Sequence, residues 1–157
     1  MNLYWIFDLD YTLYTIDTNT PFDYNLLSED THLNFLLHQK PFINFPQFIF
    51  TNAMMIHAKK CLSIMKLPTI QSIYSRDMMN DLKPNISAFN KFMEYHSIEP
   101  NDVCIFFEDS LENLKQAKEL GWITIYIGQL NNNYTFIDMH FPNIYKALDY
   151  FYVRFNK

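Results

Sequence analysis

Residues 3–10 of the chain read LYWIFDLD and decide the fold: the apolar run of residues 3–7 stops at Asp8, and a second acid follows at Asp10. Other short apolar runs lie at 48–50, 103–107 and 124–127, with a weaker candidate at 70–75. Such runs are typical of strands buried on both faces of a parallel sheet. Amphipathic helical patterns separate them, over 26–41, 53–65, 86–95, 110–120 and 144–155. This alternation predicts an α/β fold with a mainly parallel sheet of about five strands.

The composition excludes several classes of protein. A length of 157 residues is typical of one domain, and we expect residues 1–157 to form one. With 49% hydrophobic and 18% charged residues, the chain is not intrinsically disordered. Its two glycines are too few for a glycine-rich nucleotide-binding loop. The net charge of −5 argues against a broad nucleic-acid surface, although it leaves a local basic groove open.

The chain also lacks the marks of export and of membrane insertion. An acid stands as early as Asp8 and no basic leader precedes it, so we expect no signal peptide. No apolar run approaches the ~20 residues that span a bilayer. Cys61 and Cys104 lie far apart without C-x-x-C spacing, and the five histidines show no spacing typical of a metal site. We therefore expect a cytoplasmic protein with reduced thiols and no membrane partner.

Polar residues gather where the predicted strands end. Ligands of parallel α/β sheets bind beyond these carboxyl ends, where the chain places Asp8 and Asp10, then Thr51 and Asn52, then Glu108 and Asp109. Two like charges 4 Å apart repel by about 1 kcal/mol in water and by about 4 kcal/mol at an effective dielectric of 20. Mg²⁺, which prefers carboxylate and phosphate oxygens, would offset this repulsion. Lys83, in a loop before Pro84, can add a further positive charge.

These residues resemble the haloacid dehalogenase (HAD) superfamily of phosphatases. FDLDYTLY at 7–14, TNA at 51–53, the pair Lys83-Pro84 and FFEDSLENL at 106–114 match its four motifs in order. The resemblance spans nearly the whole chain and is strongest to the pyrimidine 5′-nucleotidase-like branch. It implies a three-layer Rossmann-like core and Mg²⁺-dependent hydrolysis of a phosphomonoester.

The resemblance places the central chemistry in the first motif. It implies that Asp8 attacks phosphorus, forms an aspartyl phosphate and contacts the metal. Asp10 would protonate the leaving oxygen and then activate water, while its backbone carbonyl binds the metal. Leu9 would point the opposite way, into the core. An acid at Asp10 favours phosphate over halide chemistry, because the dehalogenases of this superfamily lack one there. The alternatives are a capping residue for Asp8 and a turn residue for Asp10.

The second and third motifs would bind the phosphoryl group. The Thr51 hydroxyl and the amides of Asn52 and Ala53 would hold its oxygens at a helix start. Lys83 would neutralise the charge that develops on it. Each has an ordinary alternative, because Thr and Asn are preferred helix caps and a loop lysine before a proline is common.

The fourth motif would hold the metal. Asp109 would bind it directly and Glu108 either directly or through water, while Asn113 would orient these carboxylates or Lys83. A capping box formed by Asp109 and Glu112 for the helix over 110–120 is the alternative for Asp109. A surface position is the alternative for Asn113.

The short spacing between motifs leaves no room for a helical cap domain, which nucleotidase-like relatives carry after the first motif. Residues 11–25 suffice only for a flap-sized loop, and 53–82 for one helix and one strand. The substrate, a small molecule or a macromolecule such as a nucleic-acid end or a phosphoprotein, would then close the site by its own bulk, or a second subunit would close it in a homodimer. A non-catalytic phosphate-binding module and a dehalogenase are the alternatives to a phosphatase.

Overall fold

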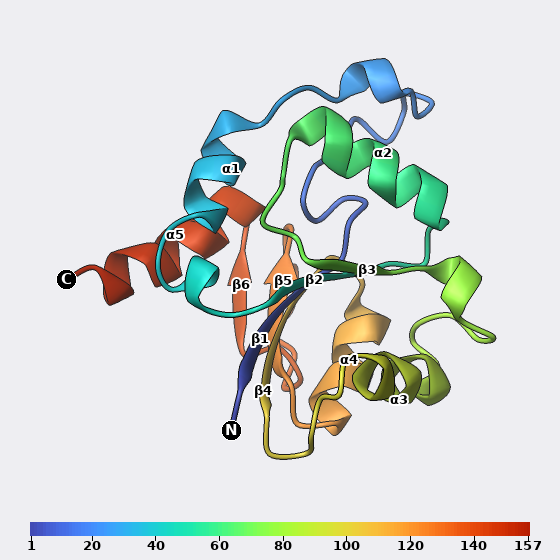
Figure 1. Cartoon of the computed structure of the whole chain (residues 1–157), viewed down its shortest axis with the longest axis vertical. Coiled ribbons are helices and arrows are strands. Elements are labelled where there is room, and N and C mark those ends of the chain that lie inside the picture. The colour runs from blue at the N-terminus through green and yellow to red at the C-terminus, as the bar shows by residue number, and fades with distance from the viewer.

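Six parallel strands form the central sheet of the computed structural model, which describes residues 1–157 (Figure 1). In chain order they are β1 (Leu3–Phe7), β2 (Gln47–Phe50), β3 (Ser72–Tyr74), β4 (Val103–Glu108), β5 (Ile123–Ile127) and β6 (Met139–Phe141). Their order across the sheet is β3-β2-β1-β4-β5-β6, and every neighbouring pair is parallel. The predicted α/β class is therefore confirmed, with β1 near the middle of the sheet.

The sheet holds one strand more than the sequence predicted. The short strand β6 pairs its residues Met139–Phe141 with Ile125–Ile127 of β5 at the sheet edge. Its sequence, Met-His-Phe, is interrupted by an exposed histidine and therefore lacks the apolar run that marks the other strands. The weak candidate at 70–75 is a real strand, β3.

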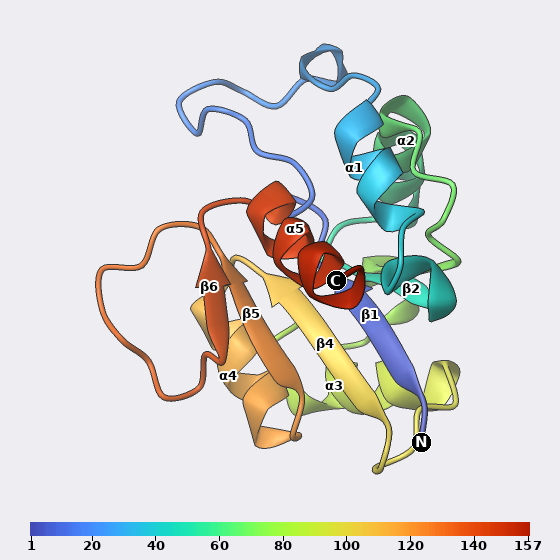
Figure 2. The same ribbon diagram turned by 90° about the vertical axis from the view of Figure 1, so that its left-hand side faces the viewer.

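Helices cover both faces of the sheet (Figures 1 and 2). They are α1 (Thr31–Leu37), α2 (Met55–Met65), α3 (Ile86–Tyr95), α4 (Leu111–Glu119) and α5 (Ile144–Phe155). Helices α1, α2 and α5 share one apolar core with the sheet, and α3 and α4 share the other. This is the predicted three-layer arrangement. None of the helices combines the length and the apolar character that crossing a bilayer requires.

The alternation of side chains along β1 connects the two cores. Trp5 and Phe7 lie in the core under α1, α2 and α5, whereas Tyr4 and Ile6 lie in the core over α3 and α4. Successive strand residues point to opposite faces, so a strand covered on both sides is apolar throughout. Leu9 continues the pattern of Trp5 and Phe7 beyond the strand end and is fully buried, as predicted.

A flap replaces any inserted helical domain between β1 and β2. Residues 8–30 rise beyond the carboxyl ends of the strands, carry one short 3₁₀ helix (Tyr24–Leu26), and lead into α1, which packs against α5 (Figure 2). The helix predicted over 26–41 is wrong at both ends, because α1 covers only Thr31–Leu37. The Asp30 carboxylate accepts a hydrogen bond from the Leu33 amide and fixes the start of α1 there.

Replacing Leu9 by alanine tests whether the core holds the first motif in place. We expect Leu9→Ala to lower the free energy of unfolding by about 2–5 kcal/mol, because it leaves a cavity beside Asp8 and Asp10. The matched change Leu26→Ala, at a flap leucine that is 47% exposed, should cost less than about 1 kcal/mol. Urea denaturation measures both values, and equal losses would show that Leu9 does not anchor the motif.

Candidate active site

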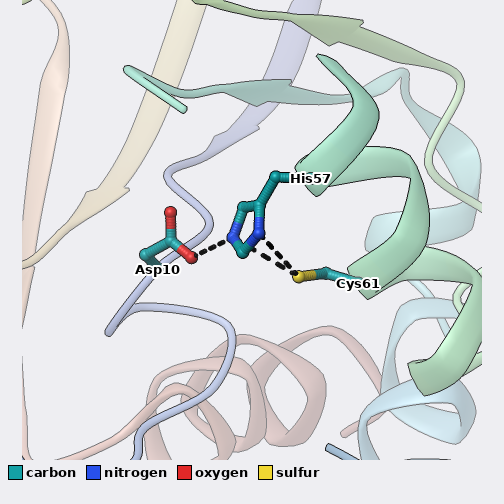
Figure 3. A group of neighbouring side chains, drawn as sticks. All are labelled: Asp10, His57 and Cys61. Carbon is teal, nitrogen blue, oxygen red and sulfur yellow. Dashed lines mark hydrogen bonds and ion pairs between the residues drawn. The ribbon is translucent and has the colours of Figure 1, made fainter. Parts of the chain in front are cut away.

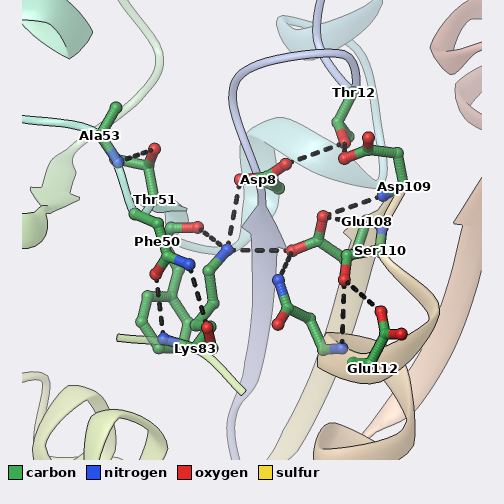
Figure 4. A network of polar contacts seen from close by, with 12 residues as sticks. Asp8, Thr12, Phe50, Thr51, Ala53, Lys83, Glu108, Asp109, Ser110 and Glu112 are labelled. Carbon is green, nitrogen blue, oxygen red and sulfur yellow. Dashed lines mark hydrogen bonds and ion pairs between the residues drawn. The ribbon is translucent and has the colours of Figure 1, made fainter. Parts of the chain in front are cut away.

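The ammonium group of Lys83 lies at the centre of the polar cluster at the carboxyl ends of β1, β2 and β4 (Figure 4). Its Nζ donates hydrogen bonds to the Phe50 carbonyl at 2.6 Å, to Glu108 Oε2 at 2.9 Å and to Asp8 Oδ1 at 3.2 Å. The side chain is 1% exposed. An ammonium has three donors and all three are used, so Lys83 is held in one position.

Burial and neighbouring charges set the protonation of this cluster. Burial alone would lower the pKa of Lys83, but Asp8 and Glu108 outweigh it and raise the pKa above its ordinary value. Burial would likewise raise the pKa of Glu108, yet Lys83 and further hydrogen bonds bring it below the ordinary value. Burial and the adjacent Glu108 raise the pKa of Asp8 well above its ordinary value. Lys83 and Glu108 are therefore a charged pair, and Asp8 is the group that a further cation would ionise.

Both carboxylate oxygens of Glu108 accept hydrogen bonds. Its Oε1 accepts hydrogen bonds from the backbone amides of Asp109 and Ser110, at 2.9 and 3.2 Å. Its Oε2 accepts from Lys83 and, at 3.1 Å, from the side-chain amide of Asn113. Asn113 is 7% exposed, so it is not the surface asparagine of the alternative prediction. Four hydrogen bonds fill the lone pairs of this carboxylate.

Asp109 is left with its carboxylate directed toward Asp8. The Thr12 hydroxyl lies between the two acids, 3.1 Å from Asp109 Oδ1 and 3.3 Å from Asp8 Oδ2. The capping box with Glu112, the alternative prediction for Asp109, does not form, because Ser110 caps α4 through its hydroxyl, which accepts from the Asn113 amide. The Asp109 carboxylate therefore does not cap the helix.

Thr51 and Asn52 do not cap α2 either, because this helix begins later than predicted, at Met55. The Thr51 hydroxyl accepts a hydrogen bond from the Ala53 amide at 3.0 Å, and its proton remains free to donate. The Asn52 side chain donates to the carbonyl of Lys83 and accepts from its amide, both at 3.0 Å. Asn52 thus fixes the Lys83 loop, a contact that the sequence did not predict.

The side chain of Asp10 is directed toward His57 on α2 (Figure 3). Its Oδ1 accepts from the Tyr14 hydroxyl and lies 2.7 Å from His57 Nε2, while its Oδ2 makes no hydrogen bond within the chain. The Nδ1 atom of His57 lies 2.9 Å from the hydroxyl of Tyr24, in the flap. Asp10 is therefore oriented through one oxygen, and the second is available to a bound molecule.

The carboxylates of Asp8, Glu108 and Asp109 could hold a cation. Their oxygens lie within 4.8 Å of one another, and burial raises the pKa of Asp109 to about 6. A donor set made only of carboxylate oxygens suits Mg²⁺, and ionising Asp8 and Asp109 together requires a compensating positive charge. Since all the Glu108 lone pairs are filled, Asp8 and Asp109 are the fitting ligands.

Thr12, which was not predicted as a site residue, is 1% exposed and joins the first and fourth motifs. In the sequence Thr12 stands two residues after Asp10, where a hydroxyl is typical of a turn. Thr12 also lines a cavity of about 370 Å³, formed by the flap and by the starts of α1 and α5. Asp8, Lys83 and Asp109 do not line this cavity, so it is separate from the acid cluster.

In a comparison with known proteins, a family pattern covers the second, third and fourth motifs but not the first, which precedes the matched residues. The sequence pattern of the haloacid dehalogenase-like hydrolases matches residues 26–127. Among solved structures, a candidate beta-phosphoglucomutase from Thermotoga maritima is similar with a TM-score of 0.73 and 15% identity, over 96% of this chain and 98% of that one.

Two further similar structures are of a dehalogenase and of a phosphatase. The L-2-haloacid dehalogenase from Xanthobacter autotrophicus has a TM-score of 0.65 and 14% identity, over 83% of this chain. A HAD phosphatase from Thermococcus onnurineus has a TM-score of 0.57 and 21% identity, over 74% of this chain. The chain spans 63% and 54% of the length of these two proteins, and 56% of another dehalogenase. At these identities the likeness shows the fold alone.

The raised pKa of Asp109 predicts that stability without metal falls as pH rises. An unfolded aspartate has a pKa of about 3.9, so between about pH 4 and pH 6 the folded protein keeps a proton that the unfolded chain releases. We expect the urea midpoint in chelator-treated buffer to fall between about pH 5 and about pH 7.5, and to fall less in Asp109→Asn. Asp149→Asn on α5 is the matched control, and an equal drop in both variants would contradict the electrostatic argument.

Proposed function

Since the chain belongs to the haloacid dehalogenase-like hydrolase family, we propose that it is a Mg²⁺-dependent phosphatase acting on a phosphomonoester through an aspartyl phosphate at Asp8. The placement of Asp8 carries this proposal. One of its oxygens contacts Lys83 and the other faces Thr12 and Asp109. A carboxylate so placed can attack phosphorus while positive charge stands beside the transferring group.

In the first step the Asp8 carboxylate attacks phosphorus, the bond to the leaving oxygen breaks, and Asp10 supplies the proton that this oxygen needs. In the second step Asp10 takes a proton from water, and the resulting hydroxide cleaves the aspartyl phosphate to give inorganic phosphate and Asp8. The free Oδ2 of Asp10 suits this role, since its Oδ1 is held by Tyr14 and His57.

Lys83 and Thr51 would stabilise the phosphoryl group during transfer. The Lys83 ammonium already lies 3.2 Å from the proposed nucleophile, and the Thr51 hydroxyl keeps a free proton. The backbone amide of Asn52 makes no hydrogen bond within the chain and would complete the phosphate-binding loop. The Asn52 side chain, which is hydrogen-bonded to the backbone amide and carbonyl of Lys83, would keep the phosphate-binding loop in position beside Lys83.

Mg²⁺ would be held by the carboxylates of Asp8 and Asp109 and by the Asp10 carbonyl that the family resemblance implies. When bound, the ion would withdraw charge from the phosphoryl oxygens and favour ionised Asp8. Glu108, whose lone pairs are occupied, would position Lys83 and Asp109 rather than bind the ion. Asn113 would in turn fix Glu108.

A phosphatase is favoured over a dehalogenase by the acid at position 10 and by the acid pair that suits a metal. Because no helical cap covers the site, the substrate is either a small molecule, such as a nucleotide, or a macromolecule. With only a flap beyond the strand ends, the bulk of the substrate or a second subunit would have to exclude water.

Removing the nucleophile gives the most direct test. We expect purified protein to hydrolyse p-nitrophenyl phosphate with Mg²⁺ and to lose activity with chelator. Asp8→Asn should reduce kcat by roughly 10³-fold or more, because the amide cannot form the acyl phosphate. Asp149→Asn should keep full activity. Undiminished hydrolysis by Asp8→Asn would overturn the mechanism, and Mg²⁺-independent release of chloride from 2-chloropropionate would favour the dehalogenase.

The proton-donor role of Asp10 predicts a dependence on the leaving group. An alkyl phosphate needs a proton on its leaving oxygen, whereas p-nitrophenolate leaves readily without one. Asp10→Asn should therefore lower kcat/KM by about 10²–10⁴-fold for an alkyl phosphate and by clearly less for p-nitrophenyl phosphate. Equal losses on both substrates would indicate that Asp10 only maintains the site.

A further inference from the structure

A second cluster of metal-ligating atoms lies beside the acid cluster and has a different chemistry (Figure 3). It consists of Asp10, in the loop after β1, and of His57 and Cys61, one turn apart on α2. Residues four apart on a helix share one face, and here that face is turned toward Asp10. The spacing of the histidines alone did not indicate a metal site, and the pairing of His57 with Cys61 was not predicted from the sequence.

The donor atoms of this cluster lie within 4.8 Å of one another, close enough to form a tetrahedral zinc site once the Asp10 and Cys61 side chains adjust. Zn–N bonds of about 2.0–2.1 Å and Zn–S bonds of about 2.3 Å place the two donors about 3.5 Å apart. Cys61 Sγ lies 3.5 Å from His57 Nε2 and 4.0 Å from Nδ1. The thiol therefore lies beside the imidazole ring, and the Cys61 side chain has to turn to bring Sγ in front of Nε2. The Asp10 Oδ1–His57 Nε2 distance is 2.7 Å, so the carboxylate needs to withdraw by roughly half an ångström to reach the separation of about 3.3 Å that tetrahedral bonds give.

The surroundings of His57 suit a metal ligand. A ligating histidine commonly donates its other ring N–H to a nearby oxygen, which fixes the ring. Here Nδ1 faces the hydroxyl of Tyr24 at 2.9 Å. A tyrosine hydroxyl can donate or accept, so Tyr24 serves His57 both when Nε2 holds a proton for Asp10 and when Nε2 binds a metal.

We propose that Asp10, His57 and Cys61 form a second metal site, selective for Zn²⁺, whose occupation inhibits hydrolysis by taking the carboxylate of Asp10. The inhibition rests on the proposed function, whereas the site itself does not. Imidazole and thiolate favour Zn²⁺, and the oxygen-only cluster of Asp8 and Asp109 favours Mg²⁺. The chain thus separates the two ions by ligand chemistry.

The ion can reach this site from the flap side. The side chains of Asp10 and His57 are 31% and 20% exposed, whereas Cys61 lies beneath them, fully buried. Burial raises the pKa of the Cys61 thiol to about 11. The thiol proton therefore leaves to solvent as the Zn–S bond forms, while the proton on His57 moves from Nε2 to Nδ1 through exchange with solvent. A water molecule would complete the four ligands.

Cobalt absorption tests the site without reference to activity. Co²⁺ replaces Zn²⁺ in such sites, and a thiolate ligand gives a charge-transfer absorption band in the near ultraviolet. We expect the whole protein, in excess Mg²⁺, to develop this band with one Co²⁺ per chain and to lose it when Zn²⁺ is added. No band in the wild-type protein, or displacement of Co²⁺ by Mg²⁺, would overturn the proposal.

Variants locate the bound ion. Cys61→Ser should abolish the band, and the matched change Cys104→Ser, at the other buried thiol, should keep it. A band that survives in Cys61→Ser, or that is lost only in Cys104→Ser, would overturn the assignment. Should Cys61→Ser not fold, His57→Gln, at a partly exposed side chain, should weaken Co²⁺ binding at least about tenfold, and unchanged binding would count against the site.

Inhibition is measured separately, as the Zn²⁺ concentration that halves p-nitrophenyl phosphate hydrolysis in excess Mg²⁺. This concentration should rise at least about tenfold in Cys61→Ala relative to Cys104→Ala. A cobalt band without zinc inhibition would refute the inhibitory half of the proposal. The Asp8→Asn experiment fails or succeeds independently of both results, so failure of the phosphatase function remains distinguishable.

Discussion

The buried ion pair of Lys83 with Glu108, which Asp8 joins through a hydrogen bond from Lys83, is the interaction on which the rest of the site depends. It joins the ends of β1 and β4 to the loop before α3, and the Phe50 carbonyl adds the end of β2. Removing one partner from a buried pair costs about 3–5 kcal/mol, because the remaining charge keeps its desolvation penalty. The sheet therefore tolerates acids at its carboxyl edge only because the chain also delivers this cation there.

One lysine cannot neutralise three carboxylates, and the structure distributes them unequally. Glu108 receives Lys83, Asn113 and two backbone amides, and its charge is stabilised entirely within the chain. Asp109 receives only the hydroxyl of Thr12, which it shares with Asp8. The deficit of positive charge is thus concentrated between Asp8 and Asp109. An ion taken from solution would bind between Asp8 and Asp109, where the chain supplies too little positive charge for both carboxylates.

The sequence predicted most of the fold because apolar runs and helical stripes follow local periodicity. It predicted the strand ends at Asp8, Thr51 and Glu108 for the same reason. It failed where several partners compete for one residue. Ser110 caps α4, while the Asp109 carboxylate contacts Thr12, which is distant in the sequence. The contacts of Thr12 and Asn52 likewise join segments that lie far apart in the chain. The edge strand β6 has too few apolar residues to be distinguished from a loop.

The two acids of the first motif are controlled by different parts of the molecule. Asp8 is fixed by Lys83 and Thr12 within the sheet edge, whereas Asp10 is fixed by Tyr14 and His57. His57 is in turn held by the flap, through the Tyr24 hydroxyl and an edge contact with Phe22 at 5.1 Å between ring centroids. The position of the flap and the orientation of Asp10 therefore share one set of contacts, while Asp8 makes none with that set. In a fold without an inserted helical domain, Tyr14, Phe22 and Tyr24 of the flap thus hold the proposed acid–base residue and its His57 partner. The proposed nucleophile contacts the flap only through Thr12 and is otherwise held by Lys83.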